Sequence, residues 1–397
     1  MKEIPVIYPG QTIGILGGGQ LGRMLAIEAR KMGYDIRTLS PEKNSPAGQI
    51  ATKEYVANYT DHEALKEFAR NVDVITFEFE NVPSETARIL SEYTPVRPLG
   101  NALHIAQNRL REKQFLQSIN IPTVPFAFVR NEKELSAALE SLGYNSILKT
   151  TDSGYDGKGQ LKISDQSNVS EALEMLKADE CVLEGFAKFY LEMSVVAARG
   201  YNGSFVHYGA VENIHRDHIL DISIAPAGLS PEISKYAVTL TKMIMDKLEY
   251  VGVLCVEFFV MDDGTILVNE FAPRPHNSGH FTIEACYTSQ FELQLRAVCG
   301  LPLGSTKQVQ PAVMVNVMGQ MWMNREPDWE AALRIPNVTL HLYGKQEPKD
   351  KRKMGHITAL ASTVEEAFDK AITARSLAFG IDPAITRKEY LQKIFRA

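Results

Sequence analysis

The chain has 397 residues, 45% of them hydrophobic, which is more than a single typical core needs, so two or three domains are expected. A formal net charge of −6 at pH 7 argues against a nucleic-acid-binding protein, because contacts to a phosphate backbone favour a basic face. The four cysteines lack the spacing of a zinc site, no apolar run reaches about 18 residues and the N-terminus has no signal-peptide core, so we expect a cytoplasmic protein without a membrane partner.

The first hundred residues alternate short apolar strands with helices, which predicts a doubly wound parallel sheet. The first predicted strand, residues 12–16, runs into the motif GGGQLG, and a helix over residues 23–32 follows. Glycines in this place let an anion approach the N-terminus of a helix. The motif also matches the dinucleotide fingerprint, but the acid that should follow the second strand is less convincing, so the phosphate of a substrate fits as well as a pyrophosphate. The fourth strand, residues 72–78, ends in acidic residues at the edge where open α/β sheets bind ligands.

A boundary is predicted near the segment PVRP, and one long helix over residues 101–119 then leads into a second unit. In this unit a predicted strand, residues 146–149, ends at Lys149, and the loop SGYDGKGQ at residues 153–160 follows. Amides beside glycine can face phosphates, and Lys149 and Lys158 add positive charge. We expect a phosphate-binding loop here, although a tight hairpin turn would also explain the glycines.

The segment CVLEGFA, residues 181–187, is predicted to be a strand that continues into a linker. Such a segment can hold an adenine between domains, with backbone groups as hydrogen-bond partners. Glu192 opens the next strand and is placed to reach a ribose hydroxyl. His215 follows a further predicted strand, residues 205–212.

Residues 251–280 are the most informative stretch. Two apolar runs flank a turn with the sequence MDDG, which predicts a hairpin, and each run carries a single acid, Glu257 or Glu270. A buried unpaired carboxylate is costly, so two on neighbouring strands need a partner, and a hard cation with oxygen ligands is the natural one. Asn269 adds a neutral oxygen ligand. An amphipathic hairpin with solvated acids is the alternative. The polar segment PRPHNSGH that follows is better explained as part of a functional site than as a linker.

Beyond residue 300 the patterns predict strands over residues 312–318, 339–343 and 356–361, and a helix over residues 364–376. These elements suggest a small sheet packed on the second unit. The basic cluster KRK at residues 351–353 is either an exposed charged turn or part of an anion site.

Five motifs, GGGQLGRML, FEFENVP, GYDGKGQ, NEFAPRPHNSGH and KMGHIT, together resemble the ATP-grasp superfamily, and within it the N5-carboxyaminoimidazole ribonucleotide synthetases of purine biosynthesis. The resemblance runs from about residue 12 to 380. It implies a mixed α/β and α+β protein that acts as a homodimer. Its parts would be a Rossmann-like pre-ATP-grasp domain that binds the acceptor ribonucleotide (1–100), an ATP-grasp domain (101–300) and a small, mainly β C-terminal domain that completes the acceptor site (301–397).

The resemblance implies a ligase reaction with small-molecule substrates. ATP and bicarbonate would give carboxyphosphate and ADP, and the carboxyl group would pass to the exocyclic amine of 5-aminoimidazole ribonucleotide. Mg²⁺ would be held by Glu257 and Glu270. The residues implied in binding ATP are Arg109, Lys149, Gly154, Tyr155, Asp156, Gly157, Lys158, Gly159, Gln160, Glu184, Gly185, Phe186, Ala187, Glu192, His215, Asn269 and Glu270.

The remaining implied residues have catalytic roles or bind the acceptor. Those with catalytic roles are Tyr155, Asp156 and Lys158, which would close over the intermediate, and Arg274, His276 and Asn277, which would orient bicarbonate. Those that would bind the acceptor are Gly19, Gln20, Leu21, Glu78, Arg352 and Lys353. Many relatives carry arginine at position 158, and lysine keeps the charge but loses the bidentate geometry, so its direct contact with bicarbonate stays open.

Three other functions stay open at this point. The nearest is another ATP-grasp ligase, such as formate-dependent glycinamide ribonucleotide transformylase, although the short C-terminal region and the segment PRPHNSGH argue against it. An NAD-dependent oxidoreductase would explain GGGQLG, and a non-enzymatic nucleotide sensor would use the same pocket.

Overall fold

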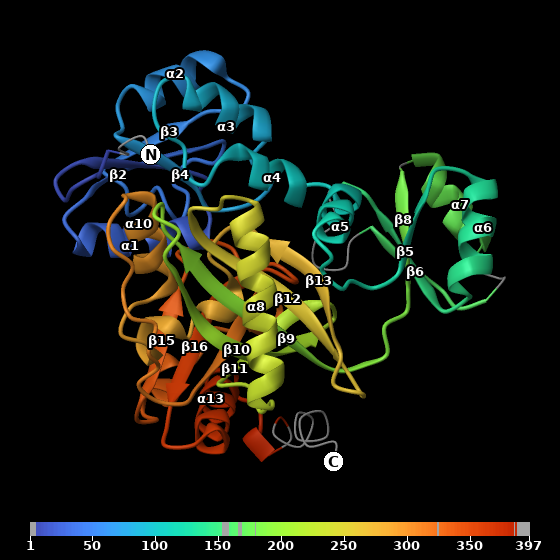
Figure 1. Cartoon of the computed structure of the whole chain (residues 1–397). Coiled ribbons are helices and arrows are strands. Elements are labelled where there is room, and N and C mark those ends of the chain that lie inside the picture. Colours follow the sequence, from blue (N-terminus) through green and yellow to red (C-terminus); the bar gives the residue numbers. More distant parts are fainter. Residues whose placement is uncertain are drawn as a thin grey trace.

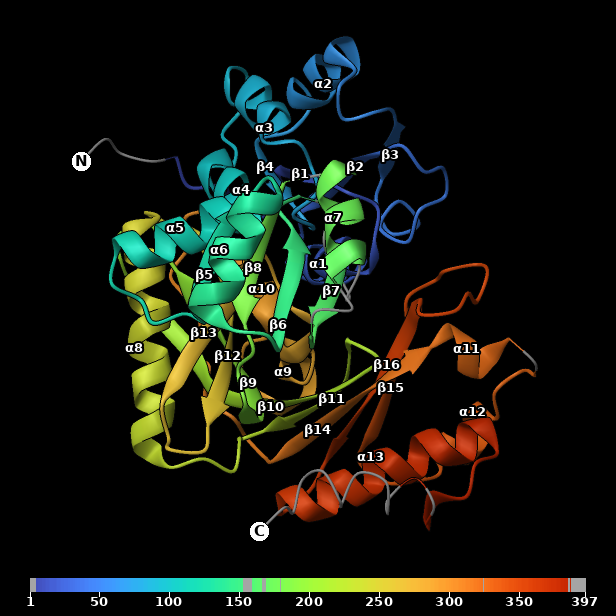
Figure 2. The same cartoon turned by 90° about the vertical axis from the view of Figure 1, so that its right-hand side faces the viewer.

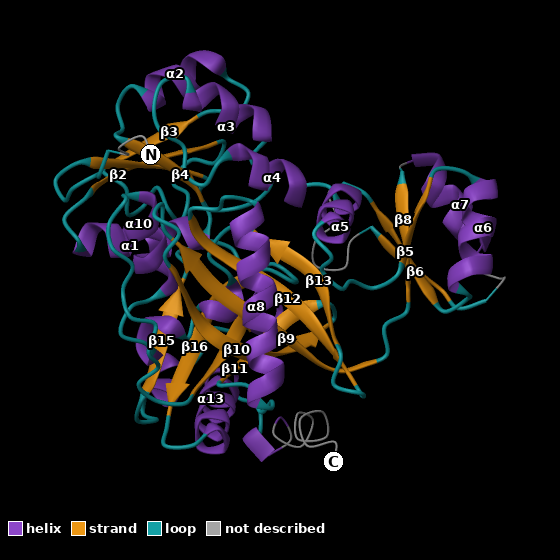
Figure 3. Ribbon diagram, in the orientation of Figure 1, coloured by secondary structure: helices purple, strands orange, loops and turns teal. Residues whose placement is uncertain are grey.

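The structure is a computed structural model, which describes residues 5–152, 159–165, 169–178, 180–323, 325–384 and 386. An N-terminal α/β unit lies above a large antiparallel sheet, and a small lobe projects to one side (Figure 1). Figure 3 shows that helices cover each of the three sheets. The arrangement is the predicted mixture of α/β and α+β structure.

The N-terminal unit is built on a parallel sheet, as predicted, and its strand order is β3-β2-β1-β4. Its strands are β1 (Thr12–Leu16), β2 (Asp35–Ser40), β3 (Lys53–Val56) and β4 (Val74–Phe77), and its helices are α1 (Gln20–Lys31), α2 (His62–Ala69) and α3 (Ser84–Ser91). Asp61 caps α2 by accepting a hydrogen bond from the backbone N–H of Ala64 at 3.1 Å. The glycine-rich motif therefore lies where β1 meets α1, at the carboxyl edge of the sheet.

The single long helix expected over residues 101–119 is wrong, because two helices occupy this stretch, α4 (Gly100–Ala106) and α5 (Arg109–Ser118). Asn108 between them has an extended backbone with φ of −133°, and its side chain accepts a hydrogen bond from the N–H of Arg111 at 2.9 Å. An asparagine cap begins a new helix even where the apolar pattern continues. The break sets the direction of α5, which carries residues of the site.

The projecting lobe contains an antiparallel sheet with the order β5-β8-β6-β7, covered by two helices (Figures 1 and 2). The elements are β5 (Phe126–Val129), α6 (Glu132–Leu142), β6 (Ser146–Thr150), β7 (Gln160–Ile163), α7 (Val169–Ala178) and β8 (Cys181–Gly185). Side chains of α6 and of the sheet share one apolar core that is separate from the core of the large sheet. The lobe presents the end of β6 toward the hairpin with the two acids.

The large sheet has the strand order β13-β12-β9-β10-β11-β14-β16-β15 within the described residues. Its strands are β9 (Phe189–Arg199), β10 (Phe205–Arg216), β11 (Ile219–Ala225), β12 (Gly252–Met261), β13 (Ile266–Ala272), β14 (Ala312–Met318), β15 (Val338–Leu342) and β16 (Lys353–Leu360). The expected separate C-terminal sheet is therefore wrong. The sequence analysis missed β11, which pairs with both β10 and β14 and so joins the C-terminal strands to the others.

Helices cover this sheet on both faces. The helical elements are α8 (Pro231–Lys247), η2 (Asn277–Gly279), α9 (Thr282–Ala285), α10 (Gln290–Val298), α11 (Gly319–Trp322), α12 (Trp329–Leu333) and α13 (Val364–Phe379). One core forms where α8 packs on β9 and β12, and another where α13 packs on β14 and β16. All four cysteines are buried, as predicted. No helix of the described chain is long and apolar enough to span a bilayer.

Candidate active site

Two carboxylates face each other on the hairpin of β12 and β13. Glu257 lies directly opposite Glu270 in the antiparallel register, and the register shifts between Glu257 and Phe258. The shift leaves Asn269 as the extra residue of a β-bulge, a feature that changes the direction of nearby side chains. The predicted hairpin is therefore confirmed, and its two acids lie side by side on neighbouring strands.

The charges around the two acids differ. Oε1 of Glu257 lies 3.0 Å from Nε2 of His276. Although burial opposes ionisation, this histidine holds the pKa of Glu257 at about 2. Burial also works against His276, but Cys255 and Glu257 raise its pKa to about 10. Partial removal from water and repulsion from Glu257 raise the pKa of Glu270, although 46% of its side chain is exposed. The surplus of negative charge at Glu270 fits a divalent cation with oxygen ligands.

A buried cluster of opposite charges lies beside the acids. Nζ of Lys149, at the end of β6, is 2.6 Å from Oε2 of Glu184 on β8, and Nζ of Lys113 on α5 is 3.4 Å from Oε1. Lys113 also donates to the carbonyl oxygen of Asn269 at 3.1 Å. Burial alone would raise the pKa of Glu184, but the two lysines hold this pKa at about 2. The side chain of Glu184, which we expected at the nucleoside, therefore pairs with lysines. Lys113 was not predicted, because a charged residue on a polar helix is normally exposed.

Arg109 and Lys149 reach the site from two different elements. Nη1 of Arg109, the first residue of α5, lies 3.7 Å from Oε2 of Glu270. The break after α4 thus brings this arginine to the acid on β13. The two cations and the two acids that the sequence predicted as phosphate and metal ligands are within one site.

The residues expected around a nucleoside occupy the connection between the lobe and the large sheet. Gly185 ends β8, and Phe186 and Ala187 continue toward β9, with the Phe186 side chain exposed. Glu192 on β9 lies 2.6 Å from Nδ1 of His215 on β10. Burial alone would lower the pKa of His215, but this carboxylate raises it. The nucleoside-binding roles of these residues stay predictions.

The segment after β13 connects the hairpin to the N-terminal unit. Arg274 forms a bidentate pair with Glu80, one arm of which measures 2.8 Å from Nη2 to Oε1. Burial alone would raise the pKa of Glu80, but Arg274 holds this pKa at about 2. The Asn277 amide exchanges two hydrogen bonds, of 2.7 and 3.1 Å, with the Asn316 amide on β14. Arg274 and Asn277 therefore have protein partners, which the sequence did not reveal, and their contacts with bicarbonate stay predictions.

The glycine-rich motif surrounds a carboxylate of the protein itself. Glu78, just beyond β4, accepts hydrogen bonds from the N–H of Gly19 at 2.6 Å and of Gly22 at 2.8 Å. A Cβ atom on Gly17 or Gly19 would lie 2.3 or 2.6 Å from the Glu78 side chain, so glycine is required at both positions. Because Glu78 already uses the Gly19 amide, a phosphate at this helix N-terminus would have to use other donors of the first turn, where Gln20 and Leu21 lie.

A basic hairpin from the C-terminal region lies close to Glu78. Arg352 and Lys353 precede and begin β16, and Nζ of Lys345 donates to the carbonyl oxygen of Lys353 at 2.7 Å. Burial and the charge of Arg352 lower the pKa of Lys345 to about 8, whereas Glu78 opposes this shift. The structure therefore brings the predicted residues of the acceptor site together. Lys345 was missed, because a lone lysine between strands carries no sequence signal.

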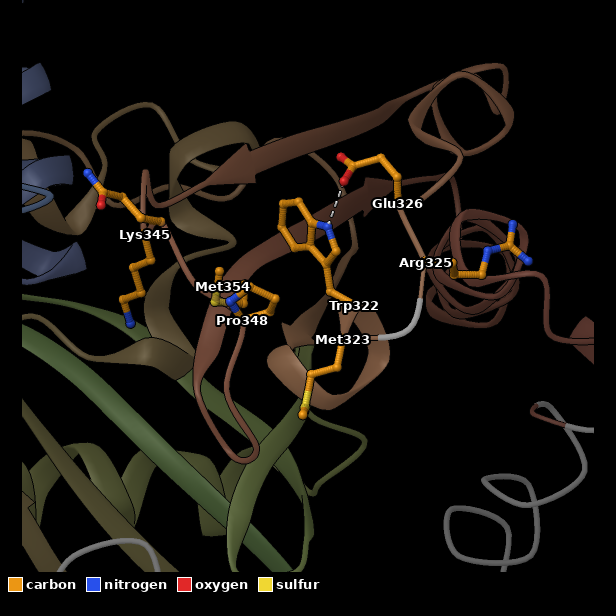
Figure 4. A pocket seen from close by; sticks show the side chains of 8 residues that line it. Trp322, Met323, Arg325, Glu326, Lys345, Pro348 and Met354 are labelled. Atoms are coloured by element: carbon orange, nitrogen blue, oxygen red, sulfur yellow. Dashed lines mark hydrogen bonds between the residues drawn. The ribbon is translucent and has the colours of Figure 1, made fainter.

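A cavity of about 460 Å³ opens beside this hairpin (Figure 4). Its lining residues are Trp322, Met323, Arg325, Glu326, Lys345, Gln346, Pro348 and Met354. The Trp322 indole N–H donates to Oε2 of Glu326 at 3.2 Å. The lining shares Lys345 with the charged cluster near Glu78.

The described part of the predicted phosphate-binding loop begins at Gly159. This residue has φ of +66°, and a Cβ atom there would lie 2.4 Å from Oγ1 of Thr150, so glycine is required. Gln160 then begins β7 and pairs with Lys149. The other predicted residues of the loop lie outside the described residues, and their roles stay predictions: Gly154, Tyr155, Asp156, Gly157 and Lys158.

Glu112 on α5 is a buried acid that the sequence analysis did not single out. It accepts a hydrogen bond from the N–H of Phe271 at 2.7 Å, and burial and repulsion from Glu270 raise its pKa to about 8. Because the folded pKa exceeds the ordinary value, wild-type stability is lost as pH rises from about 4.5 toward 8. Glu112→Gln keeps the acceptor and removes the charge, so it should stabilise the metal-free protein at pH 8.5 by roughly 1–2 kcal/mol.

Urea unfolding at pH 5 and pH 8.5 measures this effect, with Glu140→Gln on the exposed face of α6 as the control. The gain from Glu112→Gln should grow with pH, whereas the control should show none. A variant that is less stable than the wild type at pH 8.5 would contradict the assignment of Glu112 as a strained acid.

Three family models match successive parts of the chain. The ribonucleotide synthetase preATP-grasp domain matches residues 10–107, the ATP-grasp domain matches residues 114–291, and the phosphoribosylaminoimidazole carboxylase C-terminal domain matches residues 312–370. Together with the facing acids and the lysine at the end of β6, these matches define an ATP-grasp ligase.

Individual relatives narrow the class further. N5-carboxyaminoimidazole ribonucleotide synthase of Bacillus subtilis is 43% identical over 361 residues, which cover 91% of this chain and 94% of the relative. The Brucella melitensis enzyme of the same name is 47% identical, over 89% of this chain and 97% of its own. The chain belongs to the N5-carboxyaminoimidazole ribonucleotide synthase family.

Solved structures agree with this assignment. The ADP complex of an N5-carboxyaminoimidazole ribonucleotide synthetase has a TM-score of 0.89 and 43% identity, covering 95% of this chain and 99% of that one. The Aspergillus clavatus enzyme, solved with ADP and 5-aminoimidazole ribonucleotide, has a TM-score of 0.84 and 32% identity, covering 94% and 99%.

Proposed function

We propose that the protein carboxylates 5-aminoimidazole ribonucleotide with bicarbonate and ATP, giving N5-carboxyaminoimidazole ribonucleotide, ADP and phosphate through carboxyphosphate, in purine biosynthesis. The observation that carries the proposal is the site formed by Glu257 and Glu270, with the buried cations Arg109 and Lys149 on one side and His276 on the other. The names of the relatives and the ligands of the Aspergillus clavatus structure support the substrates.

In the ATP half of the reaction, Glu257 and Glu270 would hold Mg²⁺, which would neutralise charge on the transferred phosphoryl group. Within the described chain no third His, Cys, Asp or Glu side chain joins them, so Asn269 and oxygens of the substrates would complete the coordination. Lys149 and Arg109 would bind phosphate oxygens. The role of these residues is to place the γ-phosphate beside bicarbonate, which accounts for most of what such a step requires.

In the carboxylation half, the cationic groups of Arg274 and His276 would orient bicarbonate and the anionic intermediate. His276 is suited to this role because its raised pKa keeps it charged at neutral pH. The acceptor phosphate would lie between the first turn of α1 and the hairpin with Arg352 and Lys353. Gln49, between β2 and β3, donates from Nε2 to the carbonyl oxygen of Gly344 at 3.0 Å and so links the N-terminal unit to this hairpin.

We further propose that residues 1–100 and 301–397 bind the acceptor, that residues 101–300 bind ATP, and that the enzyme is a cytoplasmic homodimer. The contacts of Glu78 with the glycine-rich motif and its nearness to Lys345 support this division. The four buried cysteines, which form no disulfide bonds, fit a reducing compartment.

Product formation tests the function directly. The purified protein should release one ADP per carboxylated product when Mg²⁺, ATP, ¹³C-bicarbonate and 5-aminoimidazole ribonucleotide are all present, and mass spectrometry should find the label in the product. Activity with formate in place of bicarbonate would indicate another ATP-grasp ligase. Tight NAD binding without ADP release would indicate the oxidoreductase.

Lys353→Ala tests the acceptor site. A lysine that binds only the acceptor phosphate contributes remote binding energy, so the KM for the ribonucleotide should rise about 10- to 100-fold, and kcat falls if that energy positions the amine. The KM for ATP should change less than about twofold. Lys349→Ala, on an exposed residue of the same hairpin, is the control. Loss of ATP affinity with an unchanged ribonucleotide KM would assign the hairpin to the nucleotide instead.

A further inference from the structure

A row of three imidazole rings, two of them buried, joins the segment after β13 to the C-terminal strands. The ring centroids of His280, between η2 and α9, and His356, on β16, are 4.8 Å apart. The rings of His356 and His341, on β15, stack with centroids 4.5 Å apart. His280 and His356 are at most 1% exposed. None of these rings contributes to the ATP or bicarbonate contacts proposed above.

Hydrogen bonds fix the first ring. Oε1 of Gln290 accepts from the N–H of His276 at 2.9 Å, and its Nε2 donates to the carbonyl oxygen of His276 at 2.7 Å. These two backbone groups determine which end of the amide is nitrogen, so Nε2 also donates to Nδ1 of His280 at 3.1 Å. His280 is therefore neutral, and Gln290 ties the position of its ring to the backbone of His276.

The other end of the row reaches the basic hairpin. The Tyr343 hydroxyl lies 2.8 Å from Nδ1 of His356. The N–H of Tyr343 donates to the carbonyl oxygen of Met354 at 2.9 Å. Tyr343 lies two residues before Lys345, and His356 lies three residues after Lys353. These two side chains therefore form the base of the hairpin that carries the acceptor-site cations.

We propose that His280, Gln290, Tyr343 and His356, here called the histidine clamp, position the acceptor hairpin relative to His276. The clamp touches no substrate; it sets how far the acceptor amine lies from the carboxylated intermediate. The inference rests on the proposed function. A small displacement of a reacting group costs much of the advantage of proximity, and the intermediate then reacts with water. The clamp residues are thus positioning residues for the second half of the reaction.

Tyr343→Phe and His356→Gln test the clamp. Tyr343→Phe removes only the hydroxyl, and the Gln amide reaches past the Nδ1 position. Both should raise the ADP released per carboxylated product about threefold or more and raise the ribonucleotide KM, with the KM for ATP unchanged within about twofold. His356→Asn places a polar atom near the Nδ1 position and should restore coupling. Tyr34→Phe is the matched control, because it removes a buried hydroxyl bonded at 2.8 Å to the Ile7 carbonyl, away from the hairpin.

Two results would overturn the clamp. In the first, the Tyr343→Phe and His356→Gln variants still release one ADP per carboxylated product, which would show that the row of rings only packs the core. In the second, the control Tyr34→Phe uncouples the reaction as much as they do, which would show the same. If His356→Gln fails to fold, Tyr343→Phe alone decides, because it leaves the shape of the core intact. A wild-type protein that makes no carboxylated product would overturn the proposed function and the clamp with it, whereas coupled variants of an active enzyme would overturn the clamp alone.

Discussion

Glu270→Gln is expected to lower the rate of ADP formation by about 10³-fold or more, because a neutral amide is a poor ligand for a hard cation and several kcal/mol of transition-state stabilisation would be lost. The fold should survive. Since repulsion from Glu257 raises the pKa of Glu270, removal of the charge should leave the Tm of the metal-free protein unchanged or higher. Initial rates over a range of Mg²⁺ concentrations and thermal unfolding without metal measure the two effects.

Asp262→Asn is the matched control for this substitution, since Asp262 lies in the exposed turn of the same hairpin. It should retain the wild-type rate and Mg²⁺ dependence. If Glu270→Gln turns over at the wild-type rate in magnesium buffer, the facing acids are not the metal site, and their raised and lowered pKa values have only structural meaning.

Glu184→Gln should destabilise the protein by about 3–5 kcal/mol, because it leaves the ammonium groups of Lys113 and Lys149 buried without a carboxylate. The free energy of unfolding in urea measures the loss. Glu180→Gln, an exposed residue just before β8, should have no effect on stability. The KM for ATP should also rise, since Lys149 loses the partner that holds it in place.

The pH dependence of this loss gives a second test. The folded pKa of Glu184 is about 2, below the ordinary 4.5, so the carboxylate contributes stability above about pH 4.5 and loses it as pH falls toward 2. The gap between the wild type and Glu184→Gln should therefore be widest near neutral pH and should narrow below pH 4. A gap that stays constant down to pH 3 would argue against the ion pair as its cause.

Local patterns in the sequence were enough to predict the N-terminal parallel sheet, the strands β6 and β8, and the hairpin of β12 and β13. They failed at β11. The turn before it is formed by Asp217 and His218, both with positive φ, without the glycine that usually marks such a hairpin. The pairing of β11 with β14 joins residues such as Ile222 and Val315, which are far apart in the chain, and no local pattern encodes that contact.

The site was predictable where a residue type conflicts with its surroundings. Glu257 and Glu270 are single acids in apolar strands, and this conflict identified them. Lys113, Glu112 and Lys345 lie on a polar helix and in a polar loop, where charged side chains are normally solvated. Their burial results from tertiary packing of α5 and of the basic hairpin, so only the structure could identify them.

The position of β11 in the large sheet also determines how the chain can be divided. All seven residues of β11 are buried, and its outer hydrogen bonds go to β14. A fragment that ended before β14 would expose an apolar edge strand with unpaired backbone groups, which is a template for self-association. Proteolysis or truncation between the second and third regions should therefore yield aggregates rather than a working ATP-binding fragment.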